Sequence, residues 1–186
     1  MKYLIAGLGN IGPEYALTRH NVGFMVLDRL AAQEDFRFSF EKLAYTAVWK
    51  YKGRTLHFIK PTTYMNLSGK AVAYYLQAYG IPKENLLVIV DELQLPFGTL
   101  RIKPKGSDGG HNGLKSLQES LSGQEYCRLR FGIGNDFPKG RQVDYVLGMF
   151  DKEEMDMLPG YLDKAGEMIC SFCFNGLQTT MNNFNR

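Results

Sequence analysis

Two short runs of apolar residues constrain the fold of this chain more than any other feature. Residues 2–8 and the run LLVIV at 86–90 are almost continuously apolar, without the alternation expected of a strand that exposes one face to water. Strands of this kind are buried on both faces, as in sheets whose parallel strands are covered by helices. The runs therefore predict an α/β fold.

The segments between these runs agree with that fold class. Apolar residues recur at helical spacing in residues 21–32, 68–79, 114–121 and 155–172. Residues 44–51 and 54–60 are rich in β-branched and aromatic residues and flank Lys52-Gly53, a pattern typical of a hairpin, and strands are expected near 99–103 and from 127. The prediction is an α/β, single-domain mixed twisted sheet over residues 1–186, with helices on both faces.

Two helix starts carry capping signals. Ser68 is a candidate cap of the helix over residues 68–79, which Gly80 and Pro82 would end. Asp151 and Glu154 form a capping-box pattern at the start of the C-terminal helix.

The apolar segments predict no membrane association. None approaches the ~18 residues that a membrane span needs, and the opening MKYLIAGLGN turns polar too early for a signal peptide. We therefore expect a cytoplasmic protein. The three cysteines, an odd number, are interpreted as buried thiols rather than as a disulfide framework.

Positive charge is concentrated in one part of the chain. Residues 101–141 hold eight Lys and Arg residues against four acidic ones, a net charge of +4, whereas the remaining 145 residues carry −1. Such a basic stretch is expected of a surface that contacts phosphates, although a solvated basic face explains the charge equally well.

The segment Gly7-x-Gly9-x-x-Gly12 follows the first strand and formally matches a dinucleotide-binding fingerprint. In that fold a helix begins within the motif and directs its amino end at the pyrophosphate. Here Pro13, Glu14 and Tyr15 continue a loop. The glycines are therefore interpreted as allowing a sharp bend beside a site, and a nicotinamide or flavin cofactor is the weaker hypothesis.

His20 ends this loop at the expected start of a helix, a position that suits an imidazole for proton transfer, and a structural role is the alternative. Asp91 ends the strand LLVIVD and should emerge at the carboxyl edge of the sheet, where it is either a partner for an imidazole or the cap of a turn. His57 lies in an alternating strand and is interpreted as structural. His111 lies in a Gly-rich loop and is a candidate ligand contact.

Motifs for other chemistries are missing from the sequence. There is no G-x-S-x-G elbow, no H-E-x-x-H and no Walker-type phosphate loop. Cys170 and Cys173 lie in an expected helix without a second pair at zinc spacing, which favours packing over metal binding. The remaining interpretation is a site without cofactor or metal that uses water as the nucleophile.

Five separated blocks of the sequence resemble the bacterial-type peptidyl-tRNA hydrolases, which cleave the ester between a peptide and the terminal ribose of tRNA. The blocks span most of the chain in the family's order: GLGNIGPEY with TRHNVG, PTTYMNLSGKAV, VDELQLPFG, GGHNGLKS and RLRFGIG. Ile11 and Gln94 depart from the usual family residues, and neither carries the expected proton transfer.

The resemblance implies roles for particular residues. His20 would be the general base that activates water, Asp91 would hold its imidazole, and Asn10 would lie beside the scissile carbonyl. Substrate contacts are implied for five further residues, Tyr15, Met65, Asn66, His111 and Asn112. The basic pair that contacts tRNA would be Lys103 and Arg130, both within the basic stretch.

These observations leave three hypotheses: a peptidyl-tRNA hydrolase, a non-catalytic RNA-binding relative with the same fold, and a dinucleotide-binding protein. The first predicts peptidyl-tRNA as the partner, a monomer, no membrane and no metal. Residues 136–144 are a candidate mobile lid over the cleft.

Overall fold

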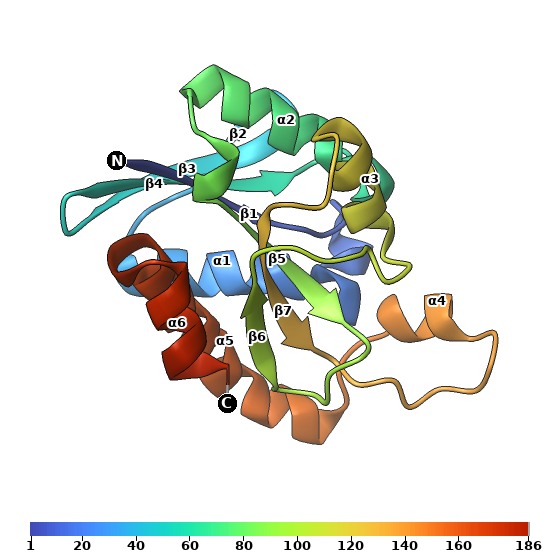
Figure 1. Cartoon of the computed structure of the whole chain (residues 1–186). Helices are drawn as coiled ribbons and strands as arrows, with labels where there is room; N and C mark the ends of the chain where they lie inside the picture. The colour runs from blue at the N-terminus through green and yellow to red at the C-terminus, as the bar shows by residue number, and fades with distance from the viewer. Residues whose placement is uncertain (186) are drawn as a thin grey trace.

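A seven-stranded sheet runs through the centre of the molecule in this computed structural model, which describes residues 1–185 (Figure 1). The strands are β1 (Lys2–Gly7), β2 (Ser39–Glu41), β3 (Ala44–Tyr51), β4 (Arg54–Pro61), β5 (Leu86–Glu92), β6 (Leu100–Lys103) and β7 (Cys127–Gly132). Their order is β2-β3-β4-β1-β5-β7-β6. The four central strands β4, β1, β5 and β7 are parallel and the outer ones antiparallel, so the predicted mixed sheet is confirmed.

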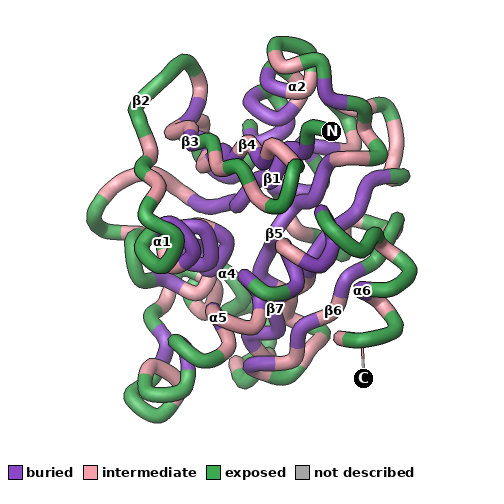
Figure 2. The backbone as a smooth tube through the Cα atoms, turned by 90° about the vertical axis from the view of Figure 1, so that its left-hand side faces the viewer, coloured by how far each residue is buried: buried purple, intermediate pink, exposed green. Residues whose placement is uncertain are grey.

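Helices cover both faces of the sheet, as predicted. They are α1 (Val22–Glu34), α2 (Ser68–Tyr79), α3 (Asn112–Ser120), α4 (Gln142–Val146), α5 (Lys152–Asn175) and α6 (Leu177–Phe184), with short 3₁₀ helices η1 (Pro13–Tyr15), η2 (Arg19–Asn21), η3 (Met65–Leu67) and η4 (Lys83–Asn85). One buried cluster joins α1 and α5 to the sheet, and a second joins α2 and α3 to its other face. Figure 2 shows the central strands as the most continuously buried part of the chain.

The apolar runs are buried as the sequence indicates. Leu4, Ile5 and Ala6 in β1, and all five residues of LLVIV in β5, have at most 1% of their surface exposed. The predicted hairpin is also present, because β3 and β4 pair in antiparallel fashion around Lys52 and Gly53. Both turn residues have positive φ, 47° and 81°, as a type I′ turn requires.

Several boundaries differ from the prediction. Ser68 does not cap α2: because η3 runs directly into this helix, its hydroxyl donates to the Met65 carbonyl instead of accepting from the first-turn amides. Helix α3 begins two residues earlier than expected, because His111 caps it. Strand β2 and helices α4 and α6 were not predicted. The Asp151 capping box is present.

The cysteines are free, with Cys127 and Cys173 buried and Cys170 partly exposed. Burial raises the pKa of the Cys127 thiol to about 11. None of the helices formed by residues 1–185 combines the length and apolar character needed to cross a membrane.

Candidate active site

The candidate site lies where the parallel strands β1 and β5 end. Gly7, the last residue of β1, is in register with Ile89, so the loop after β1 and the carboxyl end of β5 meet at one edge of the sheet. Helix α1 packs directly onto this edge at Gly23, where a Cβ would stand 2.6 Å from the Ile89 carbonyl oxygen and the Leu8 backbone nitrogen. The close packing of the helix places His20, in the short helix η2 that leads directly into α1, next to Asp91.

His20 and Asp91 form a buried hydrogen-bonded pair. The Nδ1 atom of His20 lies 2.8 Å from Oδ2 of Asp91, and the two residues are 9% and 5% exposed. Of the two readings of Asp91, the structure therefore favours the partner of an imidazole over the cap of a turn.

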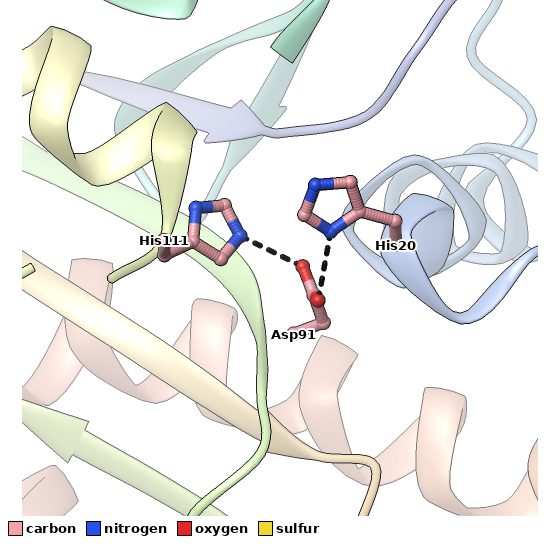
Figure 3. A group of neighbouring side chains, drawn as sticks. All are labelled: His20, Asp91 and His111. Carbon is pink, nitrogen blue, oxygen red and sulfur yellow. Dashed lines mark hydrogen bonds and ion pairs between the residues drawn. The ribbon is translucent and has the colours of Figure 1, made fainter. Parts of the chain in front are cut away.

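The second oxygen of Asp91 contacts another histidine, which the sequence did not indicate (Figure 3). Nε2 of His111 lies 2.8 Å from Oδ1 of Asp91, while Nδ1 of His111 accepts from the backbone N–H groups of Gly113 and Leu114 at the start of α3. A ring nitrogen that accepts from N–H groups carries no proton, so the His111 proton is on Nε2 and is donated to Asp91. One carboxylate is thus shared by two imidazoles.

This arrangement determines the charges at the site. Burial by itself would raise the pKa of Asp91, but the interactions with His111 and His20 outweigh it and hold that pKa below its usual range. The carboxylate is therefore ionised and accepts from both rings. With its proton on Nδ1, His20 keeps the lone pair of Nε2 for accepting a proton.

A pocket of about 130 Å³ adjoins this trio. His20, Asp91, His111 and Asn112 line it, as do residues of α4 and of the segment 92–94. Asn112 is exposed and is the first residue of α3. Of the three asparagines that the resemblance implied, Asn112 is the one that lines the same pocket as His20.

Asn10 is held in place by neighbours that sequence reasoning missed. The side chain of Asn21, directly after His20, exchanges two 2.8 Å hydrogen bonds with the backbone of Asn10. The Met65 backbone N–H donates to Oδ1 of Asn10 at 2.7 Å, which identifies that atom as the oxygen. The Nδ2 group of Asn10 makes no hydrogen bond to any of residues 1–185 and remains free to donate.

The other implied substrate contacts are more dispersed. Met65 is buried beside Asn10 and its sulfur abuts Gly113, whereas Asn66 is exposed on η3 and Tyr15 is partly exposed on η1. Neither Tyr15 nor Asn66 lines the pocket of His20. Asn10 itself lines a separate open groove of about 440 Å³.

Four cations share one face of the antiparallel pair β6 and β7, where Arg101 is opposite Arg130 and Lys103 is opposite Arg128. Lys103 is exposed. Arg130 donates from Nε to Glu92, whose oxygen is 2.8 Å away. Arg128 is 2% exposed and donates to backbone carbonyls, so it counts toward the basic stretch but not toward a basic surface.

The trio is also the one group of three or more His, Cys, Asp and Glu side chains among the described residues that is arranged to hold a metal ion; its ligand atoms lie within 4.8 Å of one another. A metal on Nε2 of His111 would have to replace the proton that this nitrogen donates to Asp91, while Nδ1 stays engaged by two backbone donors. We therefore assign no metal to it.

Comparison with known proteins identifies the family. The family model described as peptidyl-tRNA hydrolase matches residues 4–186. Peptidyl-tRNA hydrolases of Parabacteroides distasonis and Bacteroides fragilis are 58% and 56% identical, and each alignment covers 100% of this chain and 99% or 100% of the relative. The crystal structure of the Acinetobacter baumannii enzyme is 34% identical and superposes with a TM-score of 0.92 over 98% of this chain and 94% of that one. The chain therefore belongs to the peptidyl-tRNA hydrolase family.

Proposed function

We propose that this chain hydrolyses the ester bond between peptide and tRNA in peptidyl-tRNA, with His20 as the general base. The observation that carries the proposal is the bond from His20 Nδ1 to the ionised Asp91, which leaves Nε2 as a proton acceptor at the pocket. Nε2 takes a proton from water as the water oxygen attacks the ester carbonyl. Asp91 stabilises the resulting imidazolium, which then protonates the departing ribose oxygen. General-base action of this kind contributes about 10²- to 10⁴-fold in rate.

Neutral amides suit the remaining tasks. The free Nδ2 group of Asn10 is the donor for the developing oxyanion. Asn66 and Asn112 bind the peptide main chain, since a carboxamide offers both donor and acceptor whatever the peptide sequence. Tyr15, Met65 and His111 complete the substrate contacts. His111 has a second task, because it also holds Asp91.

The basic face of β6 and β7 is proposed to contact the tRNA. Lys103 and Arg130 would bind phosphates, which lets one enzyme accept tRNAs of different sequence. Glu92 holds Nε of Arg130, and this leaves the two terminal nitrogens of the guanidinium for a phosphate. A cytoplasmic location and a monomeric state remain predictions.

The decisive experiment is release of peptide from purified N-blocked aminoacyl-tRNA. We expect release by the wild type and a loss of at least 100-fold in His20→Ala. The matched control is His57→Phe, a histidine substitution outside the cleft, which should retain full activity at pH 7.5. Undiminished release by His20→Ala would rule out the assigned base. Binding of the substrate without release by the wild type would favour the non-catalytic relative.

The RNA surface is tested separately through salt. Lys103→Ala should weaken binding of the full substrate and lower the slope of log K against log salt by about 0.7 to 0.9, the contribution of one phosphate contact. Lys50→Ala, an exposed lysine on β3 near the opposite edge of the sheet, is the matched control and should leave the slope unchanged. An equal loss on a small ester fragment would contradict a phosphate role for Lys103.

A further inference from the structure

Arg19, the residue before His20, is enclosed by residues more than 120 positions away in sequence. Its side chain is 12% exposed. Nη1 donates to the backbone carbonyl of Tyr145 at 3.1 Å, and Nη2 donates to Oε1 of Glu154 at 3.3 Å. The guanidinium lies over the Tyr145 ring, 4.1 Å from its centroid. One side chain therefore joins η2, α4 and the first turn of α5.

The backbone around Arg19 is tied to the same region. Its N–H donates to the Gly148 carbonyl at 2.9 Å, and Thr18 forms an isolated antiparallel bridge with Met149. Thr18 and Arg19, which directly precede His20, are thus paired through their backbone with Gly148 and Met149, which follow α4.

Helix α4 in turn forms a wall of the candidate pocket. Gln142, Val143 and Val146 line the pocket together with His20 and Asp91. This helix has five residues, and none of them is buried. So short a helix has little stability of its own, and its position must come from contacts outside it. Figure 1 shows it on a long arm (orange), beyond the main helical layers.

We propose that Arg19 is a positioning residue that holds α4 as the wall of the cleft and fixes the His20 imidazole against Asp91. Because the guanidinium of Arg19 bonds α4 and Arg19 directly precedes His20 in the chain, displacement of α4 also displaces the base. The part of the proposal that concerns catalysis rests on the proposed function. The part that concerns the position of His20 does not.

The test is Arg19→Lys, with Arg29→Lys as its matched control. Lysine keeps the positive charge but cannot bond Tyr145 and Glu154 at once while stacking on the ring. Arg29 likewise bonds a carboxylate of α5, that of Asp163, but with a side chain that is 40% exposed and distant from the cleft. We expect kcat to fall about 10- to 100-fold in Arg19→Lys, as small misplacements of a catalytic group do, and to be unchanged in Arg29→Lys.

A second readout is independent of activity. In ¹⁵N-histidine NMR spectra, the ring N–H signal of His20 is expected to broaden or vanish in Arg19→Lys, while that of His111 persists and shows that the fold is intact. Both signals should persist in Arg29→Lys. An unchanged His20 signal in Arg19→Lys, or an unchanged kcat, would overturn the proposal.

Glu154→Gln covers the case in which Arg19→Lys fails to fold, because a Gln oxygen still accepts from the Asp151 N–H of the capping box, whereas loss of the negative charge weakens its bond with Arg19. It should broaden the His20 signal and leave the His111 signal in place, and an unchanged His20 signal would count against Arg19. If the wild type releases no peptide, the proposed function fails while the NMR comparison still decides the role of Arg19.

Discussion

Two regions of the molecule hold their histidines in opposite ways. At the carboxyl edge of the sheet, His20 and His111 each have a ring nitrogen bonded to one ionised carboxylate. In β4, His57 is stacked on Tyr79 with ring centroids 4.2 Å apart, and neither of its buried nitrogens has a partner in the described structure. In the first region Nε2 of His20 is left to accept a proton. In the second, burial favours the neutral form of the His57 ring. The partners of an imidazole, and not its burial, therefore distinguish a site from a core position.

The substitution expected to have the largest effect on this difference removes the negative charge of Asp91, which His20 and His111 share. Asp91→Asn should lower kcat by about 10³- to 10⁴-fold, because an amide cannot accept from both rings and favours the wrong tautomer of His20. Peptide release measures the effect, and thermal unfolding of the same variant serves as the control for folding. A loss below tenfold in a folded variant would mean that Asp91 does not orient the base.

Removing the hydrogen bond from His111 to Asp91 tests whether the carboxylate is shared by the two imidazoles. His111→Asn keeps an acceptor that caps α3 but is too short to reach Asp91. A hydrogen bond to a charged group contributes about 1.5–3 kcal/mol, so activity should fall about 10- to 100-fold. The pKa of Asp91 should rise as this donor is lost, and NMR titration of the carboxyl group measures it. If the pKa of Asp91 in His111→Asn equals that in the wild type, His111 does not stabilise the carboxylate.

The smallest expected effect concerns His57. Burial lowers the pKa of this ring, and the nearby charge of Lys2 lowers it further. In the unfolded chain this histidine has a pKa of about 6.5 and therefore binds a proton more readily than it does in the folded protein. The free energy of unfolding thus falls as the pH drops below about 6.5. His57→Phe keeps the stacking and should make this fall shallower. The free energy of unfolding in urea at pH 7.5 and 5.5 measures it, and equal slopes in both proteins would contradict the prediction.

The sequence predicted the features that depend on local pattern. Continuous apolar runs indicated β1 and β5, the turn residues Lys52 and Gly53 indicated the hairpin, and the position of Asp91 at a strand end indicated the edge of the sheet. Each of these follows from periodicity or from backbone preference within a few residues.

The features that were missed depend on contacts between distant residues. His111 appeared as a loop residue, because neither its contact with Asp91, 20 positions earlier, nor its capping of α3 leaves a periodic signal. The hydrogen bonds between Asn21 and the backbone of Asn10 join polar residues 11 positions apart in sequence. The pairing of Arg130 with Glu92 joins residues 38 positions apart. Such pairs are decided by which strands and loops become neighbours, and the order of the sheet was not predicted.

The close packing of α1 at Gly23 also has a consequence for protein engineering. Replacing a glycine within a helix by alanine is a standard way to stabilise a protein, since glycine costs about 1 kcal/mol there. At position 23 the new methyl group would meet backbone atoms of Leu8 and Ile89, which no change of rotamer can move aside. The helix would have to lift from the sheet and carry His20 with it. A stabilisation campaign on this enzyme should therefore leave position 23 unchanged, even though propensity scales would rank it among the first to alter.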